Sequence, residues 1–166
     1  SLNSALTLGG APLVVSGAGM LTNSTTNAAL DFTGGSLTLG LRLISVTSGT
    51  VTLSGPLAKI AGTVISASQT VPFMSVGSAT TSASVTAGGP FLNLANAVLD
   101  LTQGATDQAL LSLSHGSTVQ NTAGPFLKLT NATLNADALF KTDGASNTTT
   151  VTGSFLDLAN NASVTV

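Results

Sequence analysis

A short phrase recurs ten times along this chain and constrains its fold more than any other feature. The phrase consists of two apolar residues, one polar residue and one apolar residue, and a turn follows it. Its ten copies begin at Leu13, Ala29, Leu43, Leu57, Phe73, Phe91, Leu110, Phe126, Leu139 and Phe155. The starts lie about 16 residues apart on average, and self-similarity at a regular period is typical of repeat architectures.

The alternation inside each phrase predicts a β-strand. Successive side chains of a strand point to opposite faces, so the polar third position faces away from its two apolar neighbours. Two residues after the phrase comes a turn position, and Gly and Asn adopt the left-handed conformation of a sharp corner most easily. The residues at this position are Gly34, Ser48, Gly62, Ser78, Asn96, His115, Asn131, Gly144 and Asn160. A second alternating stretch follows, clearest at 36–39, 50–53 and 98–101.

These features predict an all-β parallel solenoid that forms one domain over residues 1–166. We expect ten turns of about 16 residues with two strands each, which would make a rod roughly 48 Å long. An alternative is fewer turns of about 34 residues, each holding two phrases. It is favoured by the spacing of three Gly-Pro pairs, Gly55-Pro56, Gly89-Pro90 and Gly124-Pro125. An antiparallel sandwich is a further alternative, but it does not require the same columns to recur ten times.

Composition narrows the range of partners. Only 6% of the residues are charged, and the chain has no Cys, Trp or Tyr. Without a Lys/Arg cluster or an aromatic stacking platform, we expect no binding of nucleic acid. No apolar run approaches the roughly 20 residues of a membrane helix, so we expect no insertion into a membrane.

The sequence also offers little for catalysis or for a cofactor. His115 is the only histidine, and it occupies a predicted corner. The only carboxylates are six aspartates, of which Asp137 and Asp143 flank one predicted strand and could approach one another. A calcium site is the alternative to solvated aspartates, but the Gly-rich nonapeptide of calcium-binding solenoids is absent. A carbohydrate-cleaving β-helix enzyme would need clustered acids or arginines beside aromatic residues, and Arg42 is the only arginine. We therefore expect a protein that is not an enzyme and holds no cofactor.

Outward Ser and Thr residues form the candidate binding surface. The hypothesis places them on one flat face made of Ser36, Thr38, Thr50, Thr52, Thr80 and Ser82, with Thr133 and Thr148 further on. Ranks of threonine can order water, as they do in ice-binding proteins. Val64, Val98, Asp100 and Asn135 interrupt these ranks, and threonine is also a common residue of exposed strands.

The two ends of the chain resemble interior parts of the repeat and not polar caps. Strand edges left open by a solenoid invite pairing with another chain. We expect self-assembly edges at Leu6, Leu8, Val164 and Val166. The expected partner is a second copy of the chain, which would give a homopolymer, or the neighbouring repeats of a longer chain.

The stretch from Gly124 to Leu134 (GPFLKLTNATL) resembles the repeats of bacterial secreted β-solenoid proteins, the adhesin, haemagglutinin and surface-filament group. The resemblance implies an extracellular or cell-surface location and a passive architectural role. The expected function is therefore a structural subunit or stalk of a surface fibre. The alternative is an adhesin-type module whose Thr, Ser and Asn residues contact a glycan, a mineral surface or ice.

Overall fold

The computed structural model describes residues 5–67, 71–103, 108–144 and 146–166, which form strands and turns without any helix. The strands assemble into four parallel sheets, here named A to D. Sheet A contains β1 (Ala5–Leu8), β5 (Ser36–Leu39), β9 (Val64–Ala67), β13 (Val98–Asp100), β17 (Thr133–Asn135) and β21 (Ser163–Thr165). Sheet B contains β2 (Leu13–Val15), β6 (Ile44–Val46), β10 (Met74–Val76), β14 (Ala109–Ser114) and β18 (Ala138–Asp143).

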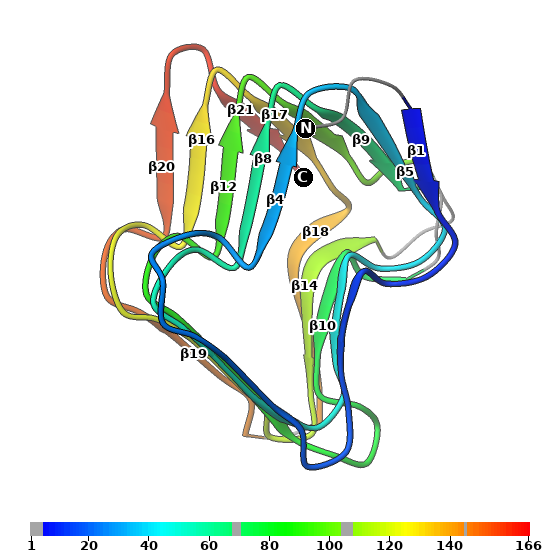
Figure 1. Ribbon diagram of the computed structural model, residues 1–166, viewed down its shortest axis with the longest axis vertical. Helices are drawn as coiled ribbons and strands as arrows, with labels where there is room; N and C mark the ends of the chain where they lie inside the picture. Colours follow the sequence, from blue (N-terminus) through cyan, green and yellow to red (C-terminus); the bar gives the residue numbers. More distant parts are fainter. Residues whose placement is uncertain (1–4, 68–70, 104–107, 145) are drawn as a thin grey trace.

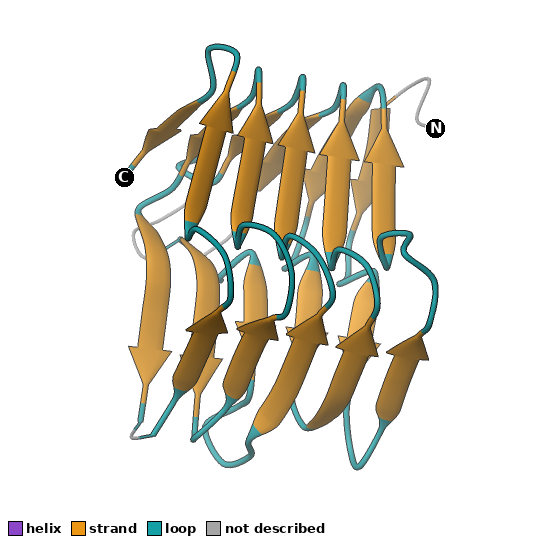
Figure 2. Cartoon of the chain, turned by 90° about the vertical axis from the view of Figure 1, so that its left-hand side faces the viewer, coloured by secondary structure: helices purple, strands orange, loops and turns teal. Residues whose placement is uncertain are grey.

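Sheets C and D lie side by side on one flank of the molecule (Figure 2). Sheet C contains β3 (Met20–Asn23), β7 (Gly49–Leu53), β11 (Ala83–Ala87), β15 (Thr118–Asn121) and β19 (Thr148–Val151). Sheet D contains β4 (Leu30–Thr33), β8 (Ala58–Ala61), β12 (Leu92–Ala95), β16 (Leu127–Thr130) and β20 (Leu156–Ala159).

The chain visits the four sheets in turn and then repeats the circuit one layer further along (Figure 1). Each strand from β1 to β17 pairs in parallel with the strand four places later in the chain, for example β5 with β9 through Leu37 and Ile65. The result is a parallel β-solenoid of about five turns of roughly 31 residues. The predicted all-β solenoid is confirmed.

The expectation of ten turns of about 16 residues with two strands each is wrong. The phrase at Leu13 pairs with the phrase at Leu43, while the intervening phrase at Ala29 lies in sheet D and pairs with the one at Leu57. Both halves of a turn carry the same strand–corner–strand pattern, so the sequence repeats at half the structural period. The alternative with two phrases per turn has the right arrangement, and the rod is about 24 Å long at the usual strand spacing.

The core lies inside the ring of sheets and consists of apolar columns that run from turn to turn. Leu37, Ile65, Leu99 and Leu134 form one such column, and each is at most 1% exposed. Phenylalanines fill the later turns: the ring centroids of Phe91 and Phe126 lie 4.8 Å apart, and those of Phe126 and Phe155 lie 5.6 Å apart. The in-register parallel pairing places like side chains directly above one another.

The corners after the phrases largely adopt the expected left-handed backbone. Asn96, Asn131 and Asn160 have φ angles of 49°, 48° and 56° where sheet D turns into sheet A. Gly34 and Gly62 serve the same corner in the earlier turns, with φ angles of 74° and 60°. The expectation fails only at Ser48 and Ser78, where the adjacent glycines, Gly49 and Gly77, carry the positive φ instead.

Candidate functional site

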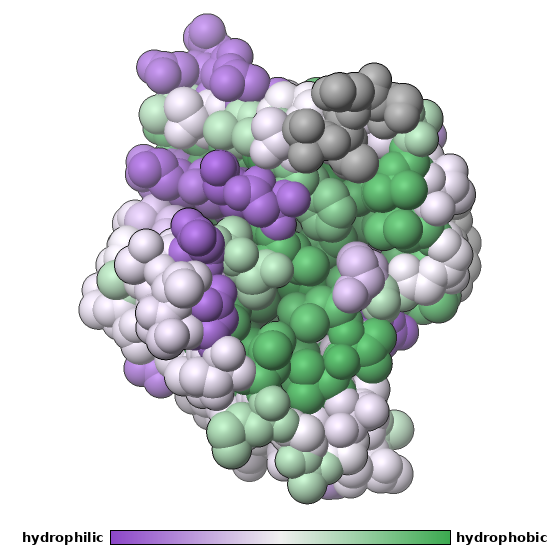
Figure 3. Space-filling view, in the orientation of Figure 1, coloured by the Kyte–Doolittle hydropathy of each residue, from purple (hydrophilic) through white to green (hydrophobic). Residues whose placement is uncertain are grey.

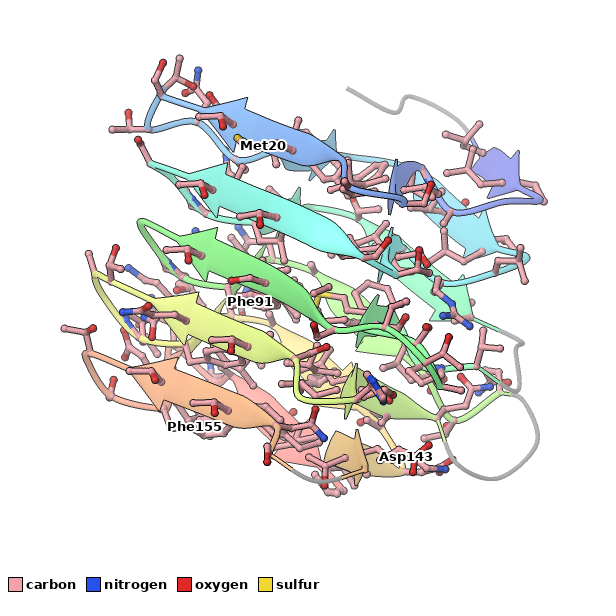
Figure 4. The ribbon with its side chains drawn as sticks, turned by 90° about the horizontal axis from the view of Figure 1, so that it is seen from below. Met20, Phe91, Asp143 and Phe155 are labelled. Carbon is pink, nitrogen blue, oxygen red and sulfur yellow. The ribbon has the colours of Figure 1, made fainter. Side chains whose placement is uncertain are left out.

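The outer face of sheet C carries two columns of uncharged side chains and is the most regular surface of the molecule. Ladder pairing aligns the first column as Met20, Thr50, Ser84, Thr118 and Thr148. It aligns the second column as Thr22, Thr52, Thr86, Gln120 and Thr150. Figure 4 looks onto these five strands, with Met20 on the first. We call these ten residues the hydroxyl face.

A buried apolar column supports the hydroxyl face from inside. Val51, Val85 and Val119 lie between its two columns, point inward and are fully buried. The backbone beneath the outward hydroxyls is therefore held by core packing on one side and by ladder hydrogen bonds on both edges of each inner strand.

The predicted Ser/Thr residues are not all brought together. Thr50 and Thr52 lie on the hydroxyl face, whereas Ser36 and Thr38 lie on β5 in sheet A. Thr80 and Ser82 were expected on a strand, but they precede β11 and lie in the loop after β10. This loop is closed by Ser78, whose N–H donates to the Thr81 carbonyl at 2.9 Å and whose Oγ lies 2.6 Å from Thr81 Oγ1. Because of this turn, β11 begins only at Ala83, and Ser84 and Thr86 occupy its outward positions.

Sequence reasoning missed most of the hydroxyl face because it treated all second strands as one set. The four interrupting residues, Val64, Val98, Asp100 and Asn135, all belong to sheet A. The strands that follow the phrases belong alternately to sheet A and to sheet C. Comparing every second one of these strands would therefore have separated the mixed outward residues of sheet A from the nearly pure Ser/Thr residues of sheet C. Thr133 likewise belongs to sheet A, and Thr148 belongs to sheet C.

Sheet D presents a column of mostly charged side chains on its outer face. Its outward column aligns Asp31, Lys59, Asn93, Lys128 and Asp157. Lys59 Nζ lies 3.5 Å from Asp31 Oδ2, and both side chains are nearly half exposed. An exposed ion pair of this kind contributes little to stability. The outer face of sheet D is therefore charged, whereas the outer face of the neighbouring sheet C is neutral.

The acidic groups and the histidine do not assemble into a reactive site. Asp137 precedes the extended strand β18 and Asp143 is its last residue, so the strand separates them by about 20 Å at the usual rise per residue. They therefore do not approach one another. His115 has a φ of 56°, as expected of a corner, and its N–H donates to the Asp143 carbonyl at 3.1 Å. Within the described ranges, no three His, Asp or similar ligands lie close enough together to hold a metal ion. Asp107 lies outside the described residues.

One aspartate has a shifted pKa. Burial raises the pKa of Asp100, but hydrogen bonds to its carboxylate outweigh burial and lower it below the ordinary value of 3.8. Thr102 donates its backbone N–H at 3.0 Å and its hydroxyl at 2.7 Å, and Gln103 Nε2 donates at 2.6 Å. All three donors follow Asp100 directly in the chain, so this cluster closes a turn.

The predicted self-assembly edges lie on the two outermost strands of sheet A. Leu6 and Leu8 belong to β1 and Val164 to β21, and these three pack partly against the core. Val166 follows β21 and is 69% exposed. The end turn that holds β1 also shows a broad apolar area in Figure 3. A hollow of about 330 Å³ in this turn is lined by residues between Leu13 and Leu21.

The described residues include no helix that is long and apolar enough to span a membrane. No protein-family model, curated protein or solved structure was found to match the chain.

Proposed function

We propose that this chain is a structural segment of an extracellular surface fibre, continued at its end turns by stacking of further β-solenoid turns. The observation that carries the proposal is the incomplete burial of core-type side chains in the first and last turns. Leu37 and Leu39 are at most 1% exposed, whereas Leu6 and Leu8, which pair with them in register, are only partly buried. A further turn laid over β1 would bury these side chains as the middle turns are buried.

The opposite end turn supports the same reading. Phe155 and Leu158 are 38% and 45% exposed, although Phe126 and Leu129 beneath them are fully buried. Each end also presents edge strands, whose unpaired backbone groups are templates for another strand. The covering turns have the same chemistry whether they belong to a second copy or to neighbouring repeats of a longer chain.

Electron microscopy of the purified chain tests assembly between copies. We expect fibres whose axial repeat is close to the height of one five-turn solenoid, about 24 Å. Leu6→Lys combined with Val164→Lys places inward-pointing charges on both edges, a device that blocks edge pairing, and should abolish the fibres. Thr38→Lys on the outer side of sheet A is the control and should leave them intact. Monomers that persist at high concentration would contradict the assembly of copies.

A second candidate function is that of a binding module, and the hydroxyl face favours it. The face is uncharged and regular, and it points outward from sheet C, whereas the stacking surfaces lie at the two ends of the solenoid. An adhesin-type role, in which this face contacts a glycan, a mineral surface or ice, is compatible with the structural role because the two use different surfaces. Adsorption of the chain to cellulose, hydroxyapatite or ice, reduced by Thr52→Lys, would support it.

A further inference from the structure

The hydroxyl face is a two-dimensional lattice. Neighbouring strands of a sheet lie about 4.8 Å apart, and alternate residues of one strand lie about 6.6 Å apart. The two columns therefore repeat in both directions at spacings set by the backbone. Eight of the ten positions hold Ser or Thr, the exceptions being Met20 and Gln120.

The hydroxyls of this lattice have no partner among the described residues, and this separates them from other hydroxyls of the chain. At the corners, Ser48 Oγ donates to the Gly17 carbonyl at 2.6 Å, and Thr63 Oγ1 donates to the Gly34 carbonyl at 3.0 Å. Within the described residues, no hydroxyl of either column bonds to the next one along it, unlike Ser163 Oγ and Thr133 Oγ1 on adjacent strands of sheet A, which lie 3.4 Å apart. Each hydroxyl of the face therefore bonds to molecules outside the protein, and the regular gaps between the side chains impose their period on those molecules.

The chemistry of the face selects among such partners. Sugar rings are commonly held by aromatic stacking and by charged or amide groups, but the face has no aromatic or charged residue and a single amide, Gln120. Ionic mineral surfaces would pair with charges that the face lacks. Threonine supplies one methyl group and one hydroxyl at seven of the ten positions, so water can be ordered around the methyls while hydrogen-bonding to the hydroxyls.

We propose that the hydroxyl face binds ice, the form of water whose oxygens themselves repeat on a lattice. The proposal rests on the binding-module function above and names its ligand. The face is rigid before it meets the ligand because Val51, Val85 and Val119 are buried behind it. Little conformational entropy is therefore lost when the surface docks.

Thermal hysteresis and partitioning into a slowly growing ice hemisphere test the proposal on the intact chain. We expect the wild-type chain to depress the freezing point below the melting point and to concentrate in the ice. Thr52→Lys raises a long charged side chain from the face and should remove most of both effects. Thr38→Lys is a close match because Thr38 is also exposed and also stands before an inward leucine, but on sheet A. It should retain both effects.

The outcomes separate this proposal from the binding function on which it rests. Absence of hysteresis and of ice partitioning in the wild-type chain would overturn ice binding. If adsorption to cellulose or hydroxyapatite were then lost in Thr52→Lys, the binding module would stand with a different ligand. Absence of adsorption to all three would overturn both. Equal losses in Thr52→Lys and Thr38→Lys, with circular dichroism unchanged, would show that the hydroxyl face is not the ice-binding surface.

Discussion

At the scale of single residues, the corners make the strictest demands on side-chain identity. A left-handed backbone costs a residue with a Cβ about 1–2 kcal/mol, and asparagine tolerates it better than most residues. Asn131 adds a compensating contact, because its Nδ2 donates to Asn96 Oδ1 of the preceding turn at 2.8 Å. Glycine becomes necessary only where the backbone of a neighbouring turn also approaches closely.

Gly77 is such a position, with a φ of 87° and with the Ser114 carbonyl oxygen and Ser117 Oγ occupying the space of a Cβ. We expect Gly77→Ala to lower the free energy of unfolding by about 2–4 kcal/mol, from backbone strain and overlap together. Gly62→Ala should cost about 1 kcal/mol, because its φ is 60° but its nearest neighbour lies 3.9 Å away. Urea titration measures both, with Gly10→Ala as the control. Equal losses in the free energy of unfolding for Gly77→Ala and Gly62→Ala would show that the close approach of the neighbouring turn at Gly77 does not matter.

The Asp100 turn predicts a specific pH dependence. Because the folded chain lowers the pKa of this carboxyl, the unfolded chain binds the proton more tightly, and stability rises with pH. The contribution is complete above the unfolded value near 3.8 and is lost as the pH falls through the lower folded value. Asp100→Asn should therefore show a smaller loss of stability than the wild type between pH 7 and pH 2.5, measured by urea unfolding. An unchanged loss would contradict the prediction.

At the scale of elements, each strand derives its stability from the strands above and below it in the same sheet. Phe126, at the start of the β16 phrase, is fully buried and contacts Phe91, Phe140 and Phe155. It joins three successive turns, and its neighbours come from β18 of sheet B as well as from the positions just before β12 and β20 of sheet D.

We expect Phe126→Ala to destabilise the chain by about 3–5 kcal/mol, because it removes a fully buried ring and leaves a cavity among three others. Phe155→Ala should cost markedly less, because Phe155 is 38% exposed and has no turn beyond it in the described chain. Thermal or urea unfolding of both variants provides the comparison. At a concentration where the chain is monomeric, a loss for Phe155→Ala as large as that for Phe126→Ala would contradict the prediction.

At the scale of the whole molecule, stability is distributed along one axis. Repeat proteins bury each turn only against its neighbours, so the end turns have one interface where the middle turns have two. The burial of the strands follows this rule: β10 is buried at every residue, whereas β1 and β21 alternate between exposed and half-buried residues.

Hydrogen exchange should reproduce this gradient. We expect amides of β10, β11 and β12 to exchange slowest and those of β1, β19 and β21 fastest, because local opening requires less free energy where fewer contacts are broken. Mass spectrometry of peptides from each turn measures the rates. Fibre assembly should protect β1 and β21 selectively, while uniform protection along the free chain would contradict the one-dimensional picture.

The local parts of this fold could be predicted from the sequence, because strand alternation and left-handed corners depend on residues adjacent in the chain. The phrase at Phe126 and the corner at Asn131 reveal a strand and a turn without any knowledge of their neighbours. The surface hypothesis was less successful. It combined Thr38 with Thr52, although these residues face different directions on different sheets.

Only the tertiary structure decided the length of a turn, and with it the composition of each face. The phrases at Leu13 and Ala29 look alike because both must present apolar side chains to the same core. The apolar pattern of the phrases therefore does not determine which phrase pairs with which. That choice depends on backbone pairing between residues about 31 positions apart, so its only traces in the sequence are long-range ones, such as the spacing of the three Gly-Pro pairs. The same pairing sorts the outward residues into a charged column on sheet D and a hydroxyl lattice on sheet C.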